Sequence, residues 1–210
     1  MLTHEEAFPN RLAGVIRCSD GQKAFHACMA AVEGGIGTLE VTTGVPEWTE
    51  IVRGLSASSG RPVGVGTVLK AEHVAMAVEA GAAFVVTPML IPEVAKAAKE
   101  LDVLCVMGAL TPTEIYQALA LYGADIVKIF PISAVGGASY LRSLSGPLPG
   151  LPLWVSGGVE LDQVGEYLKL GVRAVGLTTA LFPTDAVDKG DTETIIAKAR
   201  QAVSALAPVA

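Results

Sequence analysis

The stretch ADIVKIFP, residues 124–131, has the composition of a buried strand with a lysine at its centre. Apolar residues run from Ile126 to Phe130, and Lys128 interrupts them. Lysine is almost never fully buried unless something compensates its charge. A fold that buries this strand must therefore also give its lysine a partner or a chemical task.

Seven other runs rich in Val, Ile and Leu occur along the chain and alternate with Ala-rich stretches. In order, the eight runs are AGVIRC (13–18), TLEVTT (38–43), PVGVGTV (62–68), FVVTP (84–88), LCVMGA (104–109), IVKIFP (126–131), LWVSGG (153–158) and AVGLTT (174–179). Successive runs begin roughly 20–27 residues apart, which is the length that a strand followed by a helix requires.

Candidate helices fill the intervals between these runs, for example at residues 71–82 and 111–124. Several intervals end at a glycine, the residue that commonly terminates a helix. These glycines are Gly34, Gly81, Gly123 and Gly171. Thr111, which precedes Pro112, and Asp162 are the expected N-caps of two of the helices.

Eight strand–helix units favour an α/β fold, a single (β/α)8 TIM barrel. We expect one domain over residues 1–210, with a short N-terminal helix and a C-terminal helix. A doubly wound open sheet is the alternative architecture. It is disfavoured because no GxGxxG motif opens a helix anywhere in the chain.

The composition suits one large domain and excludes some partners. Of the 210 residues, 51% are hydrophobic and 17% charged, and the formal net charge is −6. No basic stripe offers a site for nucleic acid or an anionic membrane surface. Neither a membrane-spanning run nor a secretory signal pattern is present. The scattered Cys18, Cys28 and Cys105 are expected to be buried, reduced thiols of a cytoplasmic protein.

Strand alternation predicts which side chains share the barrel lumen, since neighbours along a strand point to opposite faces. If Val127 and Ile129 face the helices, Lys128 and Phe130 point inward. By the same rule Glu40 and Thr42 point into the lumen, as does Arg17 on the first strand. Arg17, Glu40 and Lys128 should therefore meet near the C-terminal end of the barrel, where barrel enzymes carry their active sites.

A buried lysine beside a carboxylate suits imine chemistry on a ketone. Removal from water disfavours a charged amine, so some neutral amine becomes available to attack a carbonyl carbon. The resulting iminium withdraws electrons and permits carbon–carbon cleavage or formation, while Glu40 can transfer the protons that the reaction requires. Arg17 can hold a substrate carboxylate by two hydrogen bonds.

Each of these residues also has a purely structural interpretation. Lys128 could reach solvent from a strand end, Glu40 could serve only as its ion-pair partner, and Arg17 could pair with a surface carboxylate. Neither the histidines nor the cysteines have metal-ligand spacing, so we expect a reaction without metal or cofactor. The sequence also lacks the GxSxG motif of serine hydrolases.

The loops after the seventh and eighth strands are candidates for phosphate binding, because TIM barrels commonly bind phosphate there. Ser156, Gly157 and Gly158 can offer backbone N–H groups, and Thr179 can add a hydroxyl and helix-start amides. The alternative is that the two glycines only allow the chain to turn.

Seven motifs in order resemble those of the 2-keto-3-deoxy-6-phosphogluconate aldolases, a group that includes the 6-phosphogalactonate and 4-hydroxy-2-oxoglutarate aldolases. The motifs are LEVTTGVP, GVGTVL, VVTPML, TPTE, VKIFP, VSGGV and AVGLTTAL, and the similarity extends from about Ala13 to Leu181. The resemblance implies a homotrimeric class I aldolase with a Schiff-base lysine at Lys128 and an acid/base carboxylate at Glu40. The implied substrate pocket includes Thr42, Pro88 and Phe130.

The sequence departs from the family pattern at both ends of the expected substrate. Many members carry a carboxylate-binding arginine soon after the Glu-Val-Thr motif, where this chain reads TTGVP. Others carry it on the first strand, which assigns the carboxylate to Arg17, assisted by Thr67. At the phosphate end Thr178 and Thr179 replace the usual Gly-Ser, and the Cβ of Thr178 could hinder the approach of a phosphate.

We therefore predict a metal-independent aldolase that reversibly cleaves 2-keto-3-deoxy-6-phosphogluconate into pyruvate and glyceraldehyde 3-phosphate. An aldolase for 4-hydroxy-2-oxoglutarate or 2-keto-3-deoxy-6-phosphogalactonate is the nearest alternative. A phosphate-binding barrel isomerase or decarboxylase would need no imine, and a non-catalytic barrel would not need Lys128 and Glu40 together.

Overall fold

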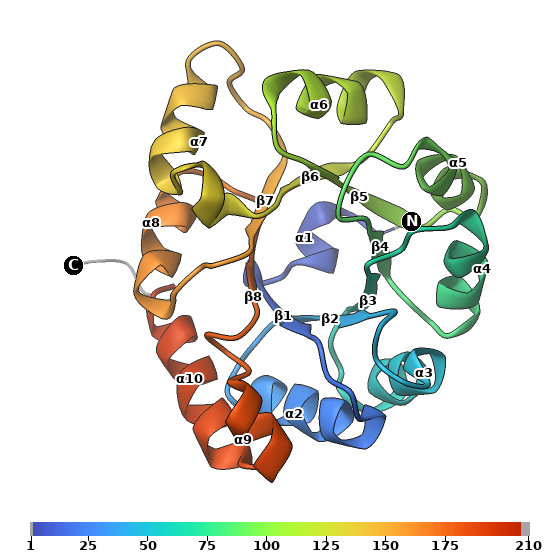
Figure 1. The fold of residues 1–210 in the computed structure, drawn as a ribbon, viewed down its shortest axis with the longest axis vertical. Coiled ribbons are helices and arrows are strands. Elements are labelled where there is room, and N and C mark those ends of the chain that lie inside the picture. The colour runs from blue at the N-terminus through green and yellow to red at the C-terminus, as the bar shows by residue number, and fades with distance from the viewer. Residues whose placement is uncertain (1, 207–210) are drawn as a thin grey trace.

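The eight apolar runs form eight parallel strands that close into a barrel, with neighbours in chain order, in a computed structural model that describes residues 2–206 (Figure 1). The strands are β1 (Leu12–Ile16), β2 (Thr38–Thr42), β3 (Val63–Gly66), β4 (Phe84–Val86), β5 (Leu104–Ala109), β6 (Ile126–Ile129), β7 (Leu153–Ser156) and β8 (Ala174–Leu177). The predicted fold class, a (β/α)8 barrel, is confirmed.

Helices cover the outside of the barrel (Figure 1). The α-helices are α1 (His4–Ala7), α2 (Gly21–Glu33), α3 (Trp48–Ser58), α4 (Ala71–Glu79), α5 (Pro92–Glu100), α6 (Pro112–Tyr116), α7 (Ala138–Ser145), α8 (Val164–Lys169), α9 (Thr184–Lys189) and α10 (Thr192–Ser204). Three shorter segments are η1 (Gln117–Leu121), a π-helical turn, and the 3-10 turns η2 (Ile132–Val135) and η3 (Leu161–Gln163). Among residues 2–206, none of the helices has both the length and the apolar character needed to cross a membrane.

Two of the predicted helix boundaries illustrate how local chemistry decides them. Thr111 caps α6, because its side chain accepts a hydrogen bond from the Glu114 N–H and Glu114 reaches back to the Thr111 N–H. The prediction for Asp162 is wrong. Asp162 lies inside η3, since the turn before α8 already begins at Glu160, whose N–H bonds the side chain of Gln163.

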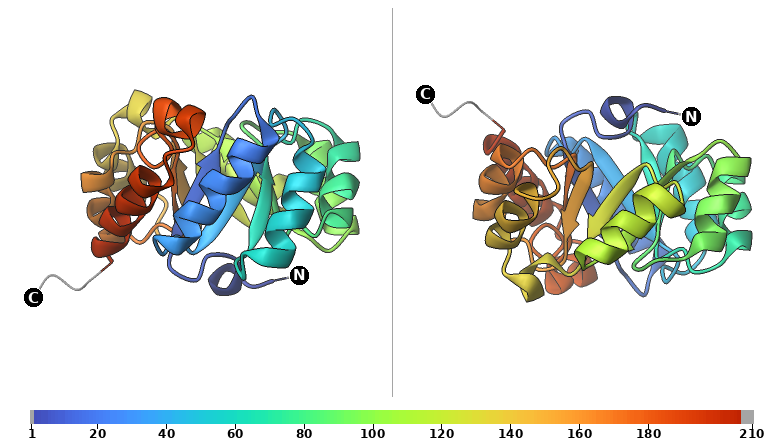
Figure 2. Two further views of the ribbon diagram at one scale, coloured as in Figure 1. Left: turned by 90° about the horizontal axis from the view of Figure 1, so that it is seen from below. Right: turned by 90° about the horizontal axis from the view of Figure 1, so that it is seen from above.

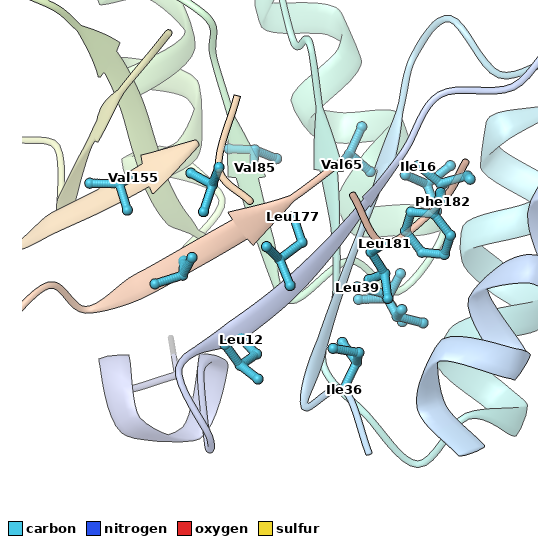
Figure 3. Packing of buried hydrophobic residues seen from close by; sticks show 14 of the residues in the cluster. Leu12, Ile16, Ile36, Leu39, Val65, Val85, Val155, Leu177, Leu181 and Phe182 are labelled. Carbon is cyan, nitrogen blue, oxygen red and sulfur yellow. The ribbon is translucent and has the colours of Figure 1, made fainter. Parts of the chain in front are cut away.

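Strand alternation divides the apolar residues into an outer and an inner core. Outward side chains such as Ile16, Leu39, Val65 and Val155 pack beneath the helices (Figure 3). Inward side chains form a separate lumen core of Ala7, Phe8, Ala13, Val15, Phe84, Val86, Leu104, Val106, Ile126, Trp154 and Ala174. The two cores share the same thin wall of strands, which explains why nearly every strand residue is apolar.

The lumen is closed at its N-terminal end by α1, which lies across the barrel opening (Figures 1 and 2). Phe8 packs its ring against those of Phe84 and Trp154, with centroid separations of 5.0 and 5.2 Å. The Thr38 hydroxyl donates a hydrogen bond to the Ala7 carbonyl and ties α1 to β2. This plug leaves the C-terminal end of the lumen as the open side.

Candidate active site

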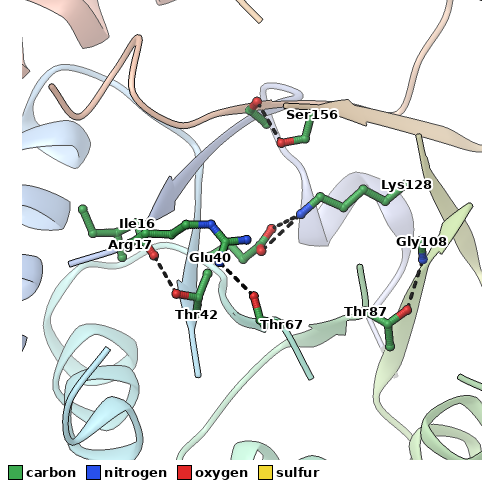
Figure 4. A network of polar contacts seen from close by, with 10 residues as sticks. Ile16, Arg17, Glu40, Thr42, Thr67, Thr87, Gly108, Lys128 and Ser156 are labelled. Carbon is green, nitrogen blue, oxygen red and sulfur yellow. Dashed lines mark hydrogen bonds and ion pairs between the residues drawn. The ribbon is translucent and has the colours of Figure 1, made fainter. Parts of the chain in front are cut away.

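Lys128 and Glu40 meet inside the barrel, as strand alternation predicts. Lys128 lies on β6 and Glu40 on β2, across the lumen from each other (Figure 4). The Lys128 Nζ donates to both Glu40 carboxylate oxygens at 3.2 and 3.1 Å. The two residues are 4% and 0% exposed, so the pair is shielded from bulk water. Buried ion pairs are weak stabilisers at best, because removing both charges from water opposes their attraction.

Gly66 makes room for the Glu40 carboxylate. An ideal Cβ at this position of β3 would lie 2.6 Å from Glu40 Cδ and 2.9 Å from Cγ, closer than non-bonded carbons approach. The φ of Gly66 lies outside the left-handed region, so the backbone itself does not require glycine. Glycine is therefore needed at this position because the Glu40 carboxylate occupies the space that a side chain would fill.

Aromatic rings complete the surroundings of the lysine. The Lys128 Nζ is 5.0 Å from the centroid of Trp154, which follows it in register on β7, and 5.8 Å from that of Phe130. Trp154 is wholly buried, whereas Phe130 is half-buried at the strand end. Phe130 thus lies near the amine.

Arg17 extends from the end of β1 at the open mouth of the barrel (Figure 4). Its Nη1 donates to the Thr67 hydroxyl at 3.2 Å, so the two residues expected at the substrate carboxylate lie in contact. Arg17 is exposed and also lines a cavity of about 190 Å³ between the ends of β1 and β8. The complete lining is Val15, Arg17, Cys18, Ser19, Thr178, Thr179, Phe182, Thr184, Val187 and Asp188.

The residues expected to bind phosphate do not all share this cavity. Thr178 and Thr179 line it, but Ser156, Gly157 and Gly158 do not. Gly157 and Gly158 have φ values of 87° and 74°, a left-handed conformation that favours glycine. The buried Ser156 hydroxyl donates to the Gly176 carbonyl at 3.2 Å. The β7 glycines therefore have a conformational reason to be present besides any ligand.

Thr42 lies at the end of β2 and Pro88 just after β4, with β3 between these two strands. Thr42 is buried and its hydroxyl donates to the Ile16 carbonyl at 3.2 Å, which ties β2 to β1. Pro88 is half-buried, and its backbone passes so close to Gly108 that a Cβ there would overlap it. Thr87 reinforces this contact by accepting a hydrogen bond from the Gly108 N–H at 3.1 Å (Figure 4).

The cysteines and candidate metal ligands add little to the site. Burial raises the pKa of Cys105 to about 12, and burial also raises the pKa of Cys28, so both thiols stay protonated at neutral pH. The expectation that Cys18 is buried is wrong, since it is partly exposed in the cavity beside Arg17. Within residues 2–206, no three His, Cys, Asp or Glu side chains gather as a metal site would require.

Sequence reasoning overlooked Trp154 and Gly66. Alternation in LWVSGG would have placed Trp154 in the lumen, because Val155 faces the helices. Gly66 carries no local signal, since its role depends on where the Glu40 side chain lies in the folded barrel. The cavity residues Ser19, Thr184 and Asp188 come from loops and a helix whose approach the strand pattern does not predict.

A closed (β/α)8 barrel with a buried lysine–glutamate pair facing its open end defines an enzyme of the imine-forming lyase class. The family model for KDPG and KHG aldolase matches residues 5–198. The chain is 35% identical to the 2-dehydro-3-deoxy-phosphogluconate aldolase of Pseudomonas aeruginosa, over 85% of this chain and 81% of that one. It is 34% identical to the KHG/KDPG aldolase of Escherichia coli, over 87% and 85% of the two chains.

Solved structures agree with these sequence relatives. A KDPG aldolase from Legionella pneumophila, described with pyruvate captured as a covalent carbinolamine intermediate, superposes with a TM-score of 0.83 at 26% identity. The alignment covers 94% of this chain and 95% of that structure. The protein therefore belongs to the KDPG and KHG aldolase family, and it is an aldehyde-lyase.

Proposed function

We propose that this aldolase reversibly cleaves 2-keto-3-deoxy-6-phosphogluconate into pyruvate and glyceraldehyde 3-phosphate through an imine on Lys128. The observation that carries the proposal is the buried contact between the Lys128 Nζ and the Glu40 carboxylate at the open end of the lumen. The amine there has a proton-transfer group within hydrogen-bond distance, which carbonyl addition and dehydration both require.

The proposed reaction begins with the formation of an imine between Lys128 and the substrate. The neutral amine of Lys128 adds to the C2 carbonyl, and the carbinolamine gains a proton and loses water to give an iminium. Glu40, the proton-transfer group in contact with Nζ, assists these steps. Removal of the C4 hydroxyl proton releases the aldehyde, and the electrons of the C3–C4 bond pass into the iminium to form an enamine. Protonation at C3 and hydrolysis then release pyruvate and restore the amine.

Recognition is assigned to the two ends of the substrate. Arg17 and Thr67, already in contact, are proposed to hold the carboxylate by charge-assisted hydrogen bonds. Ser156, Gly157, Gly158, Thr178 and Thr179 are proposed to hold the phosphate at the ends of β7 and β8. Thr42, Pro88 and Phe130 would line the space between, with Phe130 placed near the reacting nitrogen.

Cleavage of unphosphorylated 4-hydroxy-2-oxoglutarate is the second candidate function. It is favoured by Thr178, whose Cβ stands where the family pattern has glycine, and by the acidic Asp188 in the same cavity. Comparison of kcat/KM on both substrates tests the assignment, and the phosphorylated substrate should be preferred. Thr178→Gly should raise kcat/KM only for the phosphorylated substrate. A preference for 4-hydroxy-2-oxoglutarate in both the wild type and Thr178→Gly would reverse the assignment.

We further propose that the protein is a homotrimer in the cytoplasm, as the family resemblance implies. Large apolar side chains are exposed on the chain, as an oligomer interface would require. They include Leu69, Met76, Met89, Tyr116 and Leu121. The three cysteines, free of disulfides among the described residues, suit a reducing compartment. Light scattering coupled to size-exclusion chromatography should give three times the mass of 21.6 kDa, and a monomer mass would exclude the trimer.

A further inference from the structure

A tryptophan side chain on the neighbouring strand lies next to the lysine. Trp154 on β7 is paired in register with Lys128 on β6, and both side chains point into the lumen. The ring centroid lies 5.0 Å from the Lys128 Nζ, within the range of a cation–π contact. Glu40 contacts the same nitrogen at 3.1 Å, so a carboxylate and an aromatic ring together surround it.

Packing alone does not explain why this position is a tryptophan. Trp154 is 0% exposed, and its indole N–H has no hydrogen-bond partner within the described part of the chain. A buried donor without a partner is unfavourable, and a phenylalanine at this position would carry no such donor. The indole also depends on Gly176, where a Cβ would lie 2.5 Å from its nitrogen. Tryptophan is, however, the aromatic residue that binds cations most strongly.

We propose that Trp154 is a positioning residue for the aldol reaction, whose ring holds the cationic nitrogen of Lys128, as ammonium and then as iminium, next to Glu40. This inference rests on the proposed role of Lys128 as the imine-forming amine. The same ring also contacts the aromatic plug, since Trp154 packs edge-on against Phe8 and Phe84 at 5.2 and 5.9 Å.

A matched pair of substitutions separates this role from simple packing. Trp154→Leu removes the ring beside the lysine. Phe8→Leu removes a ring from the same lumen core, but the cation–π contacts described for Lys128 involve Phe130 and Trp154, not Phe8. Each purified variant is incubated with a series of pyruvate concentrations and borohydride, and the adduct on Lys128 is quantified by mass spectrometry. Thermal unfolding is measured in parallel.

The expected result is a difference between the two leucine variants. Trp154→Leu should raise the pyruvate concentration for half-maximal trapping about two- to thirtyfold, the range that loss of a cation–π contact predicts. Trp154→Phe should recover part of this loss, because its ring binds cations more weakly than an indole. Phe8→Leu should leave trapping unchanged while lowering thermal stability. Equal weakening by Phe8→Leu, or equal effects of Phe and Leu at position 154, would overturn the proposal.

Fluorescence provides a test on the intact residue, should Trp154→Leu fail to fold. The chain contains two tryptophans, so Trp48→Phe leaves Trp154 as the sole indole. Pyruvate should change its emission with the same half-saturation as trapping, and the change should vanish when Lys128→Ala is added. Unchanged emission while the adduct forms would refute contact between ring and iminium. Absence of any adduct in the parent protein would instead refute the proposed function itself.

Discussion

Gly66→Ala should separate imine formation from turnover. The new Cβ would lie 2.6 Å from Glu40 Cδ, whereas non-bonded carbons settle at about 3.5–4.0 Å. The carboxylate must therefore move by roughly 1 Å, and a displacement of that size can lower an enzymatic rate by about a hundredfold. We expect kcat for cleavage to fall by about this factor. Borohydride trapping of pyruvate on Lys128 should survive better, because the three atoms nearest the new methyl group all belong to Glu40.

The assay couples pyruvate release to a dehydrogenase, with thermal unfolding measured in parallel. Overpacking of a tight site typically costs about 1–3 kcal/mol of stability. In the Glu40→Ala background the clash is absent, so Gly66→Ala should then cost much less stability. Gly165→Ala is the control, since Gly165 lies inside α8, lacks a left-handed φ, and an added Cβ would lie 3.8 Å from its nearest neighbour outside the helix, an ordinary van der Waals contact. Wild-type turnover by Gly66→Ala would refute the argument that glycine is needed to seat Glu40.

Glu40→Gln keeps the side-chain shape but removes proton transfer, so turnover should fall about 10²–10⁴-fold while pyruvate trapping is less affected; a normal rate would reduce Glu40 to a structural partner. Arg17→Ala should lower kcat/KM about tenfold to a hundredfold on phosphorylated and unphosphorylated substrates alike. Thr179→Ala should penalise only the phosphorylated one. An effect of Arg17→Ala on that substrate alone would instead place the arginine at the phosphate. With iodoacetamide at neutral pH, Cys18 should be labelled before Cys105, because burial keeps Cys105 protonated with a pKa of about 12. Equal labelling rates for the two thiols would contradict the burial of Cys105.

The regular spacing of eight apolar runs was sufficient to predict the barrel, and strand alternation was sufficient to predict its central pair. The period of two is a local property, so IVKIFP and TLEVTT each reveal which side chains share the lumen once eight strands close. Lys128 and Glu40 therefore could be brought together from sequence, although they are 88 residues apart. The same rule reaches Trp154, and only its size and its buried N–H depend on the packed structure.

Features made by loops were less predictable, because they depend on how side chains from separate elements pack. Cys18 was expected to be buried, but the turn after β1 leaves it beside the cavity that Arg17 shares with Thr178. Asp162 was expected to cap a helix, but an earlier turn at Glu160 takes that position. Neither outcome follows from residue periodicity, and both lie outside the strands.

The most direct test of the account is the site of covalent capture. The protein is treated with pyruvate and borohydride, digested, and mapped by mass spectrometry. A single reduced three-carbon adduct on Lys128, lost in Lys128→Ala, is the predicted result. An adduct found only on exposed lysines such as Lys70 or Lys96, with cleavage activity intact, would contradict the assignment of Lys128 as the imine-forming residue.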